Sequence, residues 1–180
     1  MDSLNISQIL KGTPGVSPIE GANLEENCIV ALHKNGHMNP VLLHLLDNEQ
    51  KSVPLYWEDR FDETLERTYA DIQSVTERAA VCVSILLALN TTDYTIIERS
   101  RKGTGFDYML GDKDDLFYQP KARLEISGIY QETDSNTVEA RYLRKLKQTD
   151  ISDSTRLPAY ISVVEFGTPK AKFGRKEMKV

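Results

Sequence analysis

The feature that most constrains this chain is a nearly unbroken apolar run, AAVCVSILLAL, at residues 79–89. Eleven residues are too few to cross a bilayer, so the run is interpreted as a helix buried inside a protein. Because the run is apolar on nearly every side, such a helix must be covered on more than one face. Other elements of the chain must therefore pack around it.

The composition is that of an ordinary water-soluble protein. The chain has 180 residues, of which 40% are hydrophobic and 27% are charged, which favours a single domain over residues 1–180 with a real core. Its first twelve residues, MDSLNISQILKG, lack the apolar segment of a signal peptide. We therefore expect a cytoplasmic protein with no membrane partner. Neither Cys28 nor Cys82 lies in a CxxC motif, so a zinc knuckle is not indicated.

Residues 1–62 are predicted to be an N-terminal extension containing a β-meander. Residues 2–10 favour a short helix. Three short apolar segments, at 27–33, 40–46 and 52–57, are typical of strands. The Lys-Asn-Gly sequence at residues 34–36 separates the first two segments and indicates a hairpin.

Residues 63–166 are predicted to form the core of the domain. Apolar residues at helical spacing predict one long helix at about 63–89. Three predicted strands, a helix and a final strand follow, at 93–101, 106–110, 122–130, 135–148 and 159–166. This order predicts an α+β (mixed α/β) fold, with a central mixed sheet flanked by helices. The last strand follows a helical crossover and is expected to run parallel to a neighbour. The basic segment 167–180 is expected to fray or to pack late.

Two carboxylates lie on neighbouring predicted strands. Asp107 stands in GTGFDYML and Glu125 in LEIS, where a strand should fill a core. A buried carboxylate is costly unless it is paired or binds a metal. Mg²⁺ prefers carboxylate oxygens, and a bound divalent ion activates water for phosphodiester hydrolysis. If the two side chains share a face of the sheet, they can share one Mg²⁺ or Mn²⁺ ion.

The order of these elements and residues resembles the PD-(D/E)xK nuclease superfamily, which has the restriction endonuclease-like fold. The resemblance covers roughly residues 63–166. It implies a metal-dependent DNA endonuclease in which Asp107 and Glu125 are catalytic metal ligands. It also implies that Glu77, in TERAA on the long helix, completes the metal shell.

The chain departs from the family at the lysine of the Glu-x-Lys motif, where it has Ser127. In the family this lysine orients the attacking water or stabilises the developing charge, which a serine cannot do electrostatically. Some relatives supply the cation from the following helix, and Lys145 is the preferred candidate here. Lys121 and Arg123 are alternatives. If none of them approaches the site, the fold is kept and catalysis is impaired or lost.

The charge is unevenly spread along the chain. Residues 1–120 hold 10 Lys/Arg and 19 Asp/Glu, whereas residues 121–180 hold 12 Lys/Arg and 8 Asp/Glu. Such asymmetry can mark a surface that faces a polyanion such as DNA. The predicted DNA contacts are the basic residues of the last helix and of the tail: Arg141, Arg144, Lys147, Lys170, Lys172, Arg175 and Lys176. The alternative is an ordinary solvated surface.

Three functions follow from these patterns. The first is a nuclease, or a nuclease-like subunit of a DNA-processing or phage-defence assembly. The second is a catalytically inactive interaction module on the same fold, with a protein partner or as a homo-oligomer. The third is an antitoxin or immunity protein, which the acidic net charge favours. The carboxylates also have structural interpretations: Asp107 can cap a turn, Glu125 can pair with Arg123 or Arg99, and Glu77 can be solvated.

Overall fold

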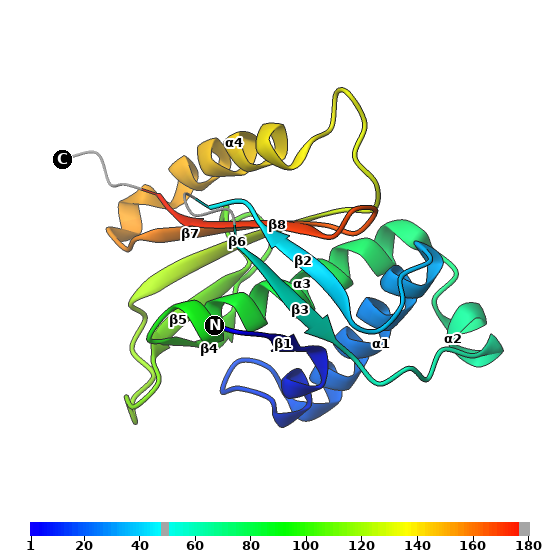
Figure 1. The fold of residues 1–180 in the computed structure, drawn as a ribbon. Helices are drawn as coiled ribbons and strands as arrows, with labels where there is room; N and C mark the ends of the chain where they lie inside the picture. The colour runs from blue at the N-terminus through cyan, green and yellow to red at the C-terminus, as the bar shows by residue number, and fades with distance from the viewer. Residues whose placement is uncertain (48–50, 177–180) are drawn as a thin grey trace.

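The computed structural model describes residues 1–47 and 51–176. Within these residues, eight strands form one mixed sheet in the order β1-β3-β2-β8-β7-β6-β5-β4 (Figure 1). The strands are β1 (Leu4–Asn5), β2 (Val41–Leu45), β3 (Ser52–Tyr56), β4 (Tyr94–Arg99), β5 (Tyr108–Asp112), β6 (Ala122–Ile129), β7 (Ala159–Glu165) and β8 (Lys170–Arg175). Helices flank the sheet, so the predicted α+β class is confirmed.

The helices cover both faces of the sheet. They are η1 (Ile6–Lys11), α1 (Pro18–Lys34), α2 (Glu63–Thr68), α3 (Ile72–Thr91), α4 (Val138–Gln148) and η2 (Thr149–Thr155). Figure 1 shows α4 on one side of the sheet, with α1 and α3 on the other. On the α4 side, Val138 and Tyr142 pack with Ile161 and Val163 of β7. The sheet is therefore the middle layer of three.

The central part of the sheet follows the prediction. Strands β4, β5 and β6 form an antiparallel meander, and β7 runs parallel to β6 after α4. Alternate residues of β6 point to opposite faces. Leu124 and Ile126 belong to the core shared with α1 and α3. Glu125 and Ser127 consequently lie on the face that α4 covers.

Close packing of α3 against β6 depends on a glycine next to these polar residues. A Cβ atom at Gly128 would lie 2.5 Å from the carbonyl oxygen of Thr76 in α3. No side chain fits at that distance, so glycine is required for this approach. The contact brings the N-terminal half of α3 close to the end of β6 that carries Glu125 and Ser127.

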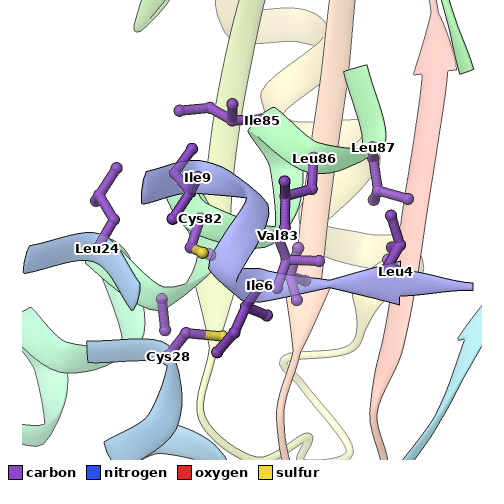
Figure 2. Packing of buried hydrophobic residues seen from close by; sticks show 14 of the residues in the cluster. Leu4, Ile6, Ile9, Leu24, Cys28, Cys82, Val83, Ile85, Leu86 and Leu87 are labelled. Atoms are coloured by element: carbon purple, nitrogen blue, oxygen red, sulfur yellow. The ribbon is translucent and has the colours of Figure 1, made fainter. Parts of the chain in front are cut away.

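The apolar run at 79–89 is a buried helix, as predicted. Its side chains pack against η1 and α1, and Figure 2 shows Ile6, Ile9, Leu24 and Cys28 gathered around Cys82 and its neighbours in α3. Helix α3 has the length and hydropathy of a membrane span, but 61% of its most apolar window is buried inside the protein. Such burial is typical of the core helix of a water-soluble fold.

The predicted strand at 27–33 is wrong, because these residues belong to helix α1. Ser17 caps the helix by accepting a hydrogen bond from the Glu20 N–H at 3.2 Å, and Pro18 occupies the first turn. Residues 27–32 are all buried, against α3 and η1. A continuous apolar run fits either a buried strand or a buried helix, and here the length of the helix decides.

The predicted hairpin at residues 34–36 is also wrong. Asn35 is the C-terminal cap of α1, and Gly36 follows it with a φ of 75°. A left-handed glycine ends a helix as readily as it makes a hairpin turn. The Lys-Asn-Gly sequence is therefore a helix stop in this chain. The other two predicted N-terminal strands are confirmed as β2 and β3.

The long helix predicted at 63–89 is two helices, α2 and α3. The chain breaks after Tyr69, and Asp71 caps the new helix by accepting hydrogen bonds from Gln73 and Ser74 N–H at 2.9 and 3.2 Å. The Tyr69 hydroxyl donates to Glu26 of α1 at 2.6 Å. This tertiary bond and the local cap together explain the break.

The two ends of the chain also differ from the prediction. Residues 2–10 hold strand β1 followed by η1 instead of one helix. Residues 170–175 do not fray: they form β8, which pairs with β2 on one side and β7 on the other. Because β8 joins β2 and β3 to the core strands, segment 1–62 shares the sheet with the core. Residues 177–180 of the predicted tail lie outside the described residues.

Candidate functional site

Asp107 and Glu125 lie on the same face of the sheet, next to each other. Asp107 immediately precedes β5, and its backbone N–H donates to the Leu124 carbonyl at 2.8 Å. Tyr108 pairs with Leu124 in the ladder, and both belong to the core on the α3 side. The residues beside them, Asp107 and Glu125, therefore face α4, and both line a pocket of about 490 Å³.

The Asp107 carboxylate is held by the backbone of β6. Its Oδ2 accepts a hydrogen bond from the Ile126 N–H at 2.7 Å. Burial raises the pKa of Asp107, although the Ile126 N–H and the charge of Lys145 act in the opposite direction. This fixed carboxylate still lines the pocket, so it is both anchored and accessible from the pocket.

Glu125 is 2% exposed and has the more strongly shifted pKa. Burial and then the charge of Asp107 raise the pKa of Glu125 to about 7, and Lys145 lowers it. A buried carboxylate pair of this kind holds a proton near neutral pH or binds a cation. The pair therefore costs folding free energy when both members are ionised and nothing is bound.

Lys145 of α4 supplies the cation closest to this pair. Its Nζ lies 2.6 Å from Oε1 of Glu125 and donates to Oε1 of Gln148 at 3.1 Å. Gln148 in turn donates to the same Glu125 oxygen at 2.9 Å. Residues three apart share one face of a helix, so Lys145 and Gln148 approach Glu125 together. The predicted alternative partner of Glu125, Arg123, points elsewhere.

Arg123 has a structural role in the protein. Its side chain is 1% exposed, and it donates to the carbonyls of Thr149 and Leu157 and to the carboxylate of Asp153. These bonds tie β6 to η2 and to the segment that leads into β7. Among the described contacts, Arg123 donates to backbone carbonyl oxygens, and the cation that contacts Glu125 is Lys145.

Ser127 takes the position of the family lysine and meets an arginine. It is 9% exposed, and Arg141 of α4 donates to its Oγ at 3.2 Å. Asn136 accepts two further bonds from the Arg141 guanidinium, at 2.7 and 3.1 Å. Burial lowers the pKa of Arg141, and nearby Arg144 adds to that effect. Two cations from α4 thus stand over β6, Lys145 at Glu125 and Arg141 at Ser127.

Glu77 is less closely associated with the carboxylate pair. It is an exposed residue of α3 that lines a pocket of about 500 Å³ together with Asp107, and it accepts a bond from Gln73 at 3.4 Å. Among the described residues, no three His, Cys, Asp or Glu side chains group closely enough to hold a metal ion. Mg²⁺ usually takes one or two carboxylates and keeps several waters, so the paired carboxylates of Asp107 and Glu125 could hold such an ion without a third protein ligand.

The predicted DNA contacts fall into two groups. Two lysines of β8 and Lys176, which follows the strand, make ion pairs within the protein. Lys170 pairs with Glu132 at 2.5 Å, Lys172 with Glu139, and Lys176 with Asp150 at 2.6 Å. Four arginine or lysine residues make no ion pair shorter than 4 Å in the described chain, namely Arg141, Arg144, Lys147 and Arg175. The ion pairs leave the first group with little net positive charge to offer DNA.

Three residues near the carboxylates were not assigned to the site from the sequence. Gln148 binds Glu125, while Arg78 of α3 and Arg99 of β4 line the pocket that contains Asp107. The spacing of three residues between Lys145 and Gln148 is the one local signal for Gln148. Arg78 and Arg99 reach the site through the packing of α3 and β4, which no local pattern in the sequence reveals.

Comparison with known proteins adds no relative: no family model, no curated protein and no solved structure matches this chain. The resemblance to the PD-(D/E)xK superfamily therefore rests on the order of the elements and on the residues described above.

Proposed function

We propose that this chain is a metal-dependent nuclease that acts on DNA, alone or as the nuclease-like subunit of a DNA-processing or phage-defence assembly. The observation that carries the proposal is the meeting of three side chains on one face of the sheet: Asp107, Glu125 and, from α4, Lys145. They supply the two carboxylates and the cation that a PD-(D/E)xK site needs, although the motif itself has Ser127. A cytoplasmic location belongs to the same proposal, and the lack of an apolar signal segment in MDSLNISQILKG supports it.

The geometry suggests a separate role for each of the three side chains. Asp107 and Glu125 are the residues that would hold Mg²⁺ or Mn²⁺, which polarises a phosphate and activates a bound water. The Ile126 N–H fixes Asp107, so one ligand is positioned before a metal arrives. Lys145 keeps its ammonium group beside Glu125 and can stabilise negative charge that develops on the phosphate. A metal that displaces the ammonium from the Glu125 oxygen would leave it free for that role.

The test is cleavage of supercoiled, linear and single-stranded DNA with Mg²⁺ or Mn²⁺. We expect the wild type to cleave at least one of these substrates and Asp107→Asn to be inactive. Asp114→Asn, which changes an exposed aspartate of the β5–β6 hairpin, is the matched control and should remain active. Failure of the wild type to cleave any substrate with either metal would remove the nuclease proposal.

A second candidate is an interaction module that kept the fold without catalysis. Two observations favour it. Glu125 is already paired with Lys145 and Gln148, so the site is satisfied without a metal. In addition, the tip of the β5–β6 hairpin exposes two large apolar side chains, Leu116 at 87% and Phe117 at 84%. Exposed apolar groups of this size are typical of protein contacts.

This alternative predicts a partner or a homo-oligomer whose contact includes the hairpin tip. Size-exclusion chromatography with light scattering on the wild type and on Leu116→Ser/Phe117→Ser would test self-association. A shift from oligomer to monomer in the double variant, together with an inactive wild type, would favour the module. An active wild-type nuclease with an unchanged size in both proteins would reject it.

A further inference from the structure

The pocket that contains Asp107 is lined by basic residues from more than one element of the fold. The pocket has a volume of about 500 Å³, and Leu24 of α1 and Val81 of α3 contribute apolar surface to it. Arg78 of α3 and Arg99 of β4 line it, as do Arg141 and Lys145 of α4. Asp107 thus shares this pocket with cations from three different elements.

Glu20 of α1 forms ion pairs with both Arg78 and Arg99. Its Oε2 lies 2.9 Å from Nη2 of Arg78, whereas Arg99 is 3.9 Å from its Oε1. That Oε1 is buried and accepts no hydrogen bond in the described chain. Asn23 holds the Nε of Arg78 from the other side, at 2.5 Å. Two guanidinium groups therefore share the Glu20 carboxylate, and Asp107 and Glu77 line the same pocket.

Arg99 is the more loosely held of the two. Its side chain is 68% exposed. Among the described residues, its one ion pair is the long contact with Glu20. A purely structural role for Glu20 would need Arg78 alone, since that pair is short and further anchored by Asn23. The Arg99 guanidinium makes no hydrogen bond within the described residues, so its N–H donors are available to an anion in the pocket.

We propose that Arg78 and Arg99 form a second phosphate subsite, which takes a phosphate of the nucleic-acid strand next to the one held at Asp107 and Glu125. The inference rests on the proposed function, since the ligand is a neighbouring phosphate of the same strand. A pocket of about 500 Å³ has room for one or two nucleotides. Arginine suits this role because its planar guanidinium makes paired hydrogen bonds to phosphate oxygens.

Dinucleotides give the most direct test, because a ligand this short cannot bind in several alignments along the pocket. Calorimetry would compare three dinucleotides: dTpdT with one internal phosphate, the same compound with a 5′-phosphate, and the same compound with a 3′-phosphate. Ca²⁺, which takes oxygen ligands as Mg²⁺ does, would replace the catalytic metal. We expect one terminal phosphate to tighten binding by about tenfold, as a charge-assisted hydrogen bond does.

The variant Arg99→Gln should bind dTpdT as the wild type does and lose the tenfold gain from the terminal phosphate. Arg99→Lys, which keeps the charge, should retain part of the gain. Arg67→Gln changes an exposed arginine on α2 and should behave as the wild type. These results would support the subsite whether or not the protein cleaves DNA.

The contrary results separate the two proposals. If dTpdT binds and neither terminal phosphate adds affinity, or if Arg99→Gln keeps the gain, the subsite is rejected while the nuclease proposal stands. If no dinucleotide binds the wild type at millimolar concentration, the subsite is rejected, and the cleavage assays alone decide the nuclease proposal.

Discussion

The ammonium group of Lys145 lies 2.6 Å from the carboxylate of Glu125, although the two residues come from a helix and a strand on different layers of the fold. The contact places a cation beside the residue that stands two positions before Ser127. It offers a physical substitute for the lysine that the Glu-x-Ser sequence lacks.

Removal of the Lys145 cation should abolish cleavage without unfolding the protein. Lys145→Ala is expected to lower the cleavage rate by about a hundredfold or more, as loss of a charge-stabilising group does. The measurement is plasmid nicking with Mg²⁺, accompanied by a thermal melt. Lys11→Ala, which changes an exposed lysine at the end of η1, is the control and should cleave normally. Wild-type activity in Lys145→Ala would assign the residue a structural role only.

A lysine at the family position should compensate for that loss. The double variant Lys145→Ala/Ser127→Lys is expected to recover about tenfold of the lost rate, because charge returns to the carboxylate pair. Ser127→Lys alone should gain little, since Lys145 already supplies a cation to the carboxylate pair. Cleavage assays on the three variants decide the matter. A double variant no faster than Lys145→Ala would speak against an exchange of roles between positions 127 and 145.

Metal should reverse the stability order of the wild type and Asp107→Asn. Without metal, the carboxylates of Asp107 and Glu125 repel each other, so the asparagine variant should melt at or above the wild-type temperature. An asparagine oxygen can still accept the hydrogen bond from Ile126.

With Mg²⁺ at a hundredfold over its Kd, the wild type should gain about 2.7 kcal/mol that the variant lacks. Four melting curves, in EDTA and in Mg²⁺, give the result. If Asp107→Asn melts lower in both conditions by the same amount, Asp107 serves the fold and not a metal.

The stability of the metal-free protein should fall as the pH rises toward neutrality. The pKa of Glu125 is raised from 4.5 in the unfolded chain to about 7, chiefly by burial and then by the charge of Asp107. The folded state therefore binds this proton more tightly than the unfolded state does. The associated stability is complete below about pH 4.5 and is lost as the pH rises through about 7.

The loss amounts to about 3 kcal/mol by the usual conversion of a pKa shift. Urea unfolding in EDTA at pH 5 and at pH 8 would measure it. Glu125→Gln cannot ionise and should lose clearly less stability than the wild type between these two pH values. Glu66→Gln, an exposed residue of α2, should follow the wild type. An equal pH dependence in Glu125→Gln would mean that Glu125 does not titrate in this range.

Arg123 should be essential for the scaffold and not for chemistry. Arg123→Met removes the buried donors to the Thr149 and Leu157 carbonyls and leaves Asp153 without this partner. Loss of one member of a buried charged network costs about 3 kcal/mol or more. Urea unfolding measures the loss, and Arg144→Met on the exposed side of α4 should change stability by less than about 0.5 kcal/mol. A stable Arg123→Met would contradict the structural role.

The comparison of sequence and structure shows where local patterns fail. Segment 27–33 has the composition of a strand but belongs to α1, because a capping serine and a proline ten residues upstream start a helix there. Residues 170–175 have the basic composition of a solvated tail but pair on both sides in the sheet. In each case the deciding interaction involves residues outside the local window.

The sequence by itself determined the elements whose patterns are local and strong. The helix at 79–89, the meander from 93 to 130, the crossover helix and the return strand follow from hydrophobic spacing. The register of β5 and β6, which the tertiary structure sets, puts Asp107 and Glu125 on one face. Only the tertiary structure decided what stands opposite them. Lys145, Gln148 and Arg141 reach β6 because α4 packs across it. Arg78 reaches the pocket because Gly128 lets α3 lie close to the sheet, and Arg99 reaches it because β4 pairs with β5. Such placements depend on the distances and angles between packed layers, and local spacing along the chain does not encode them.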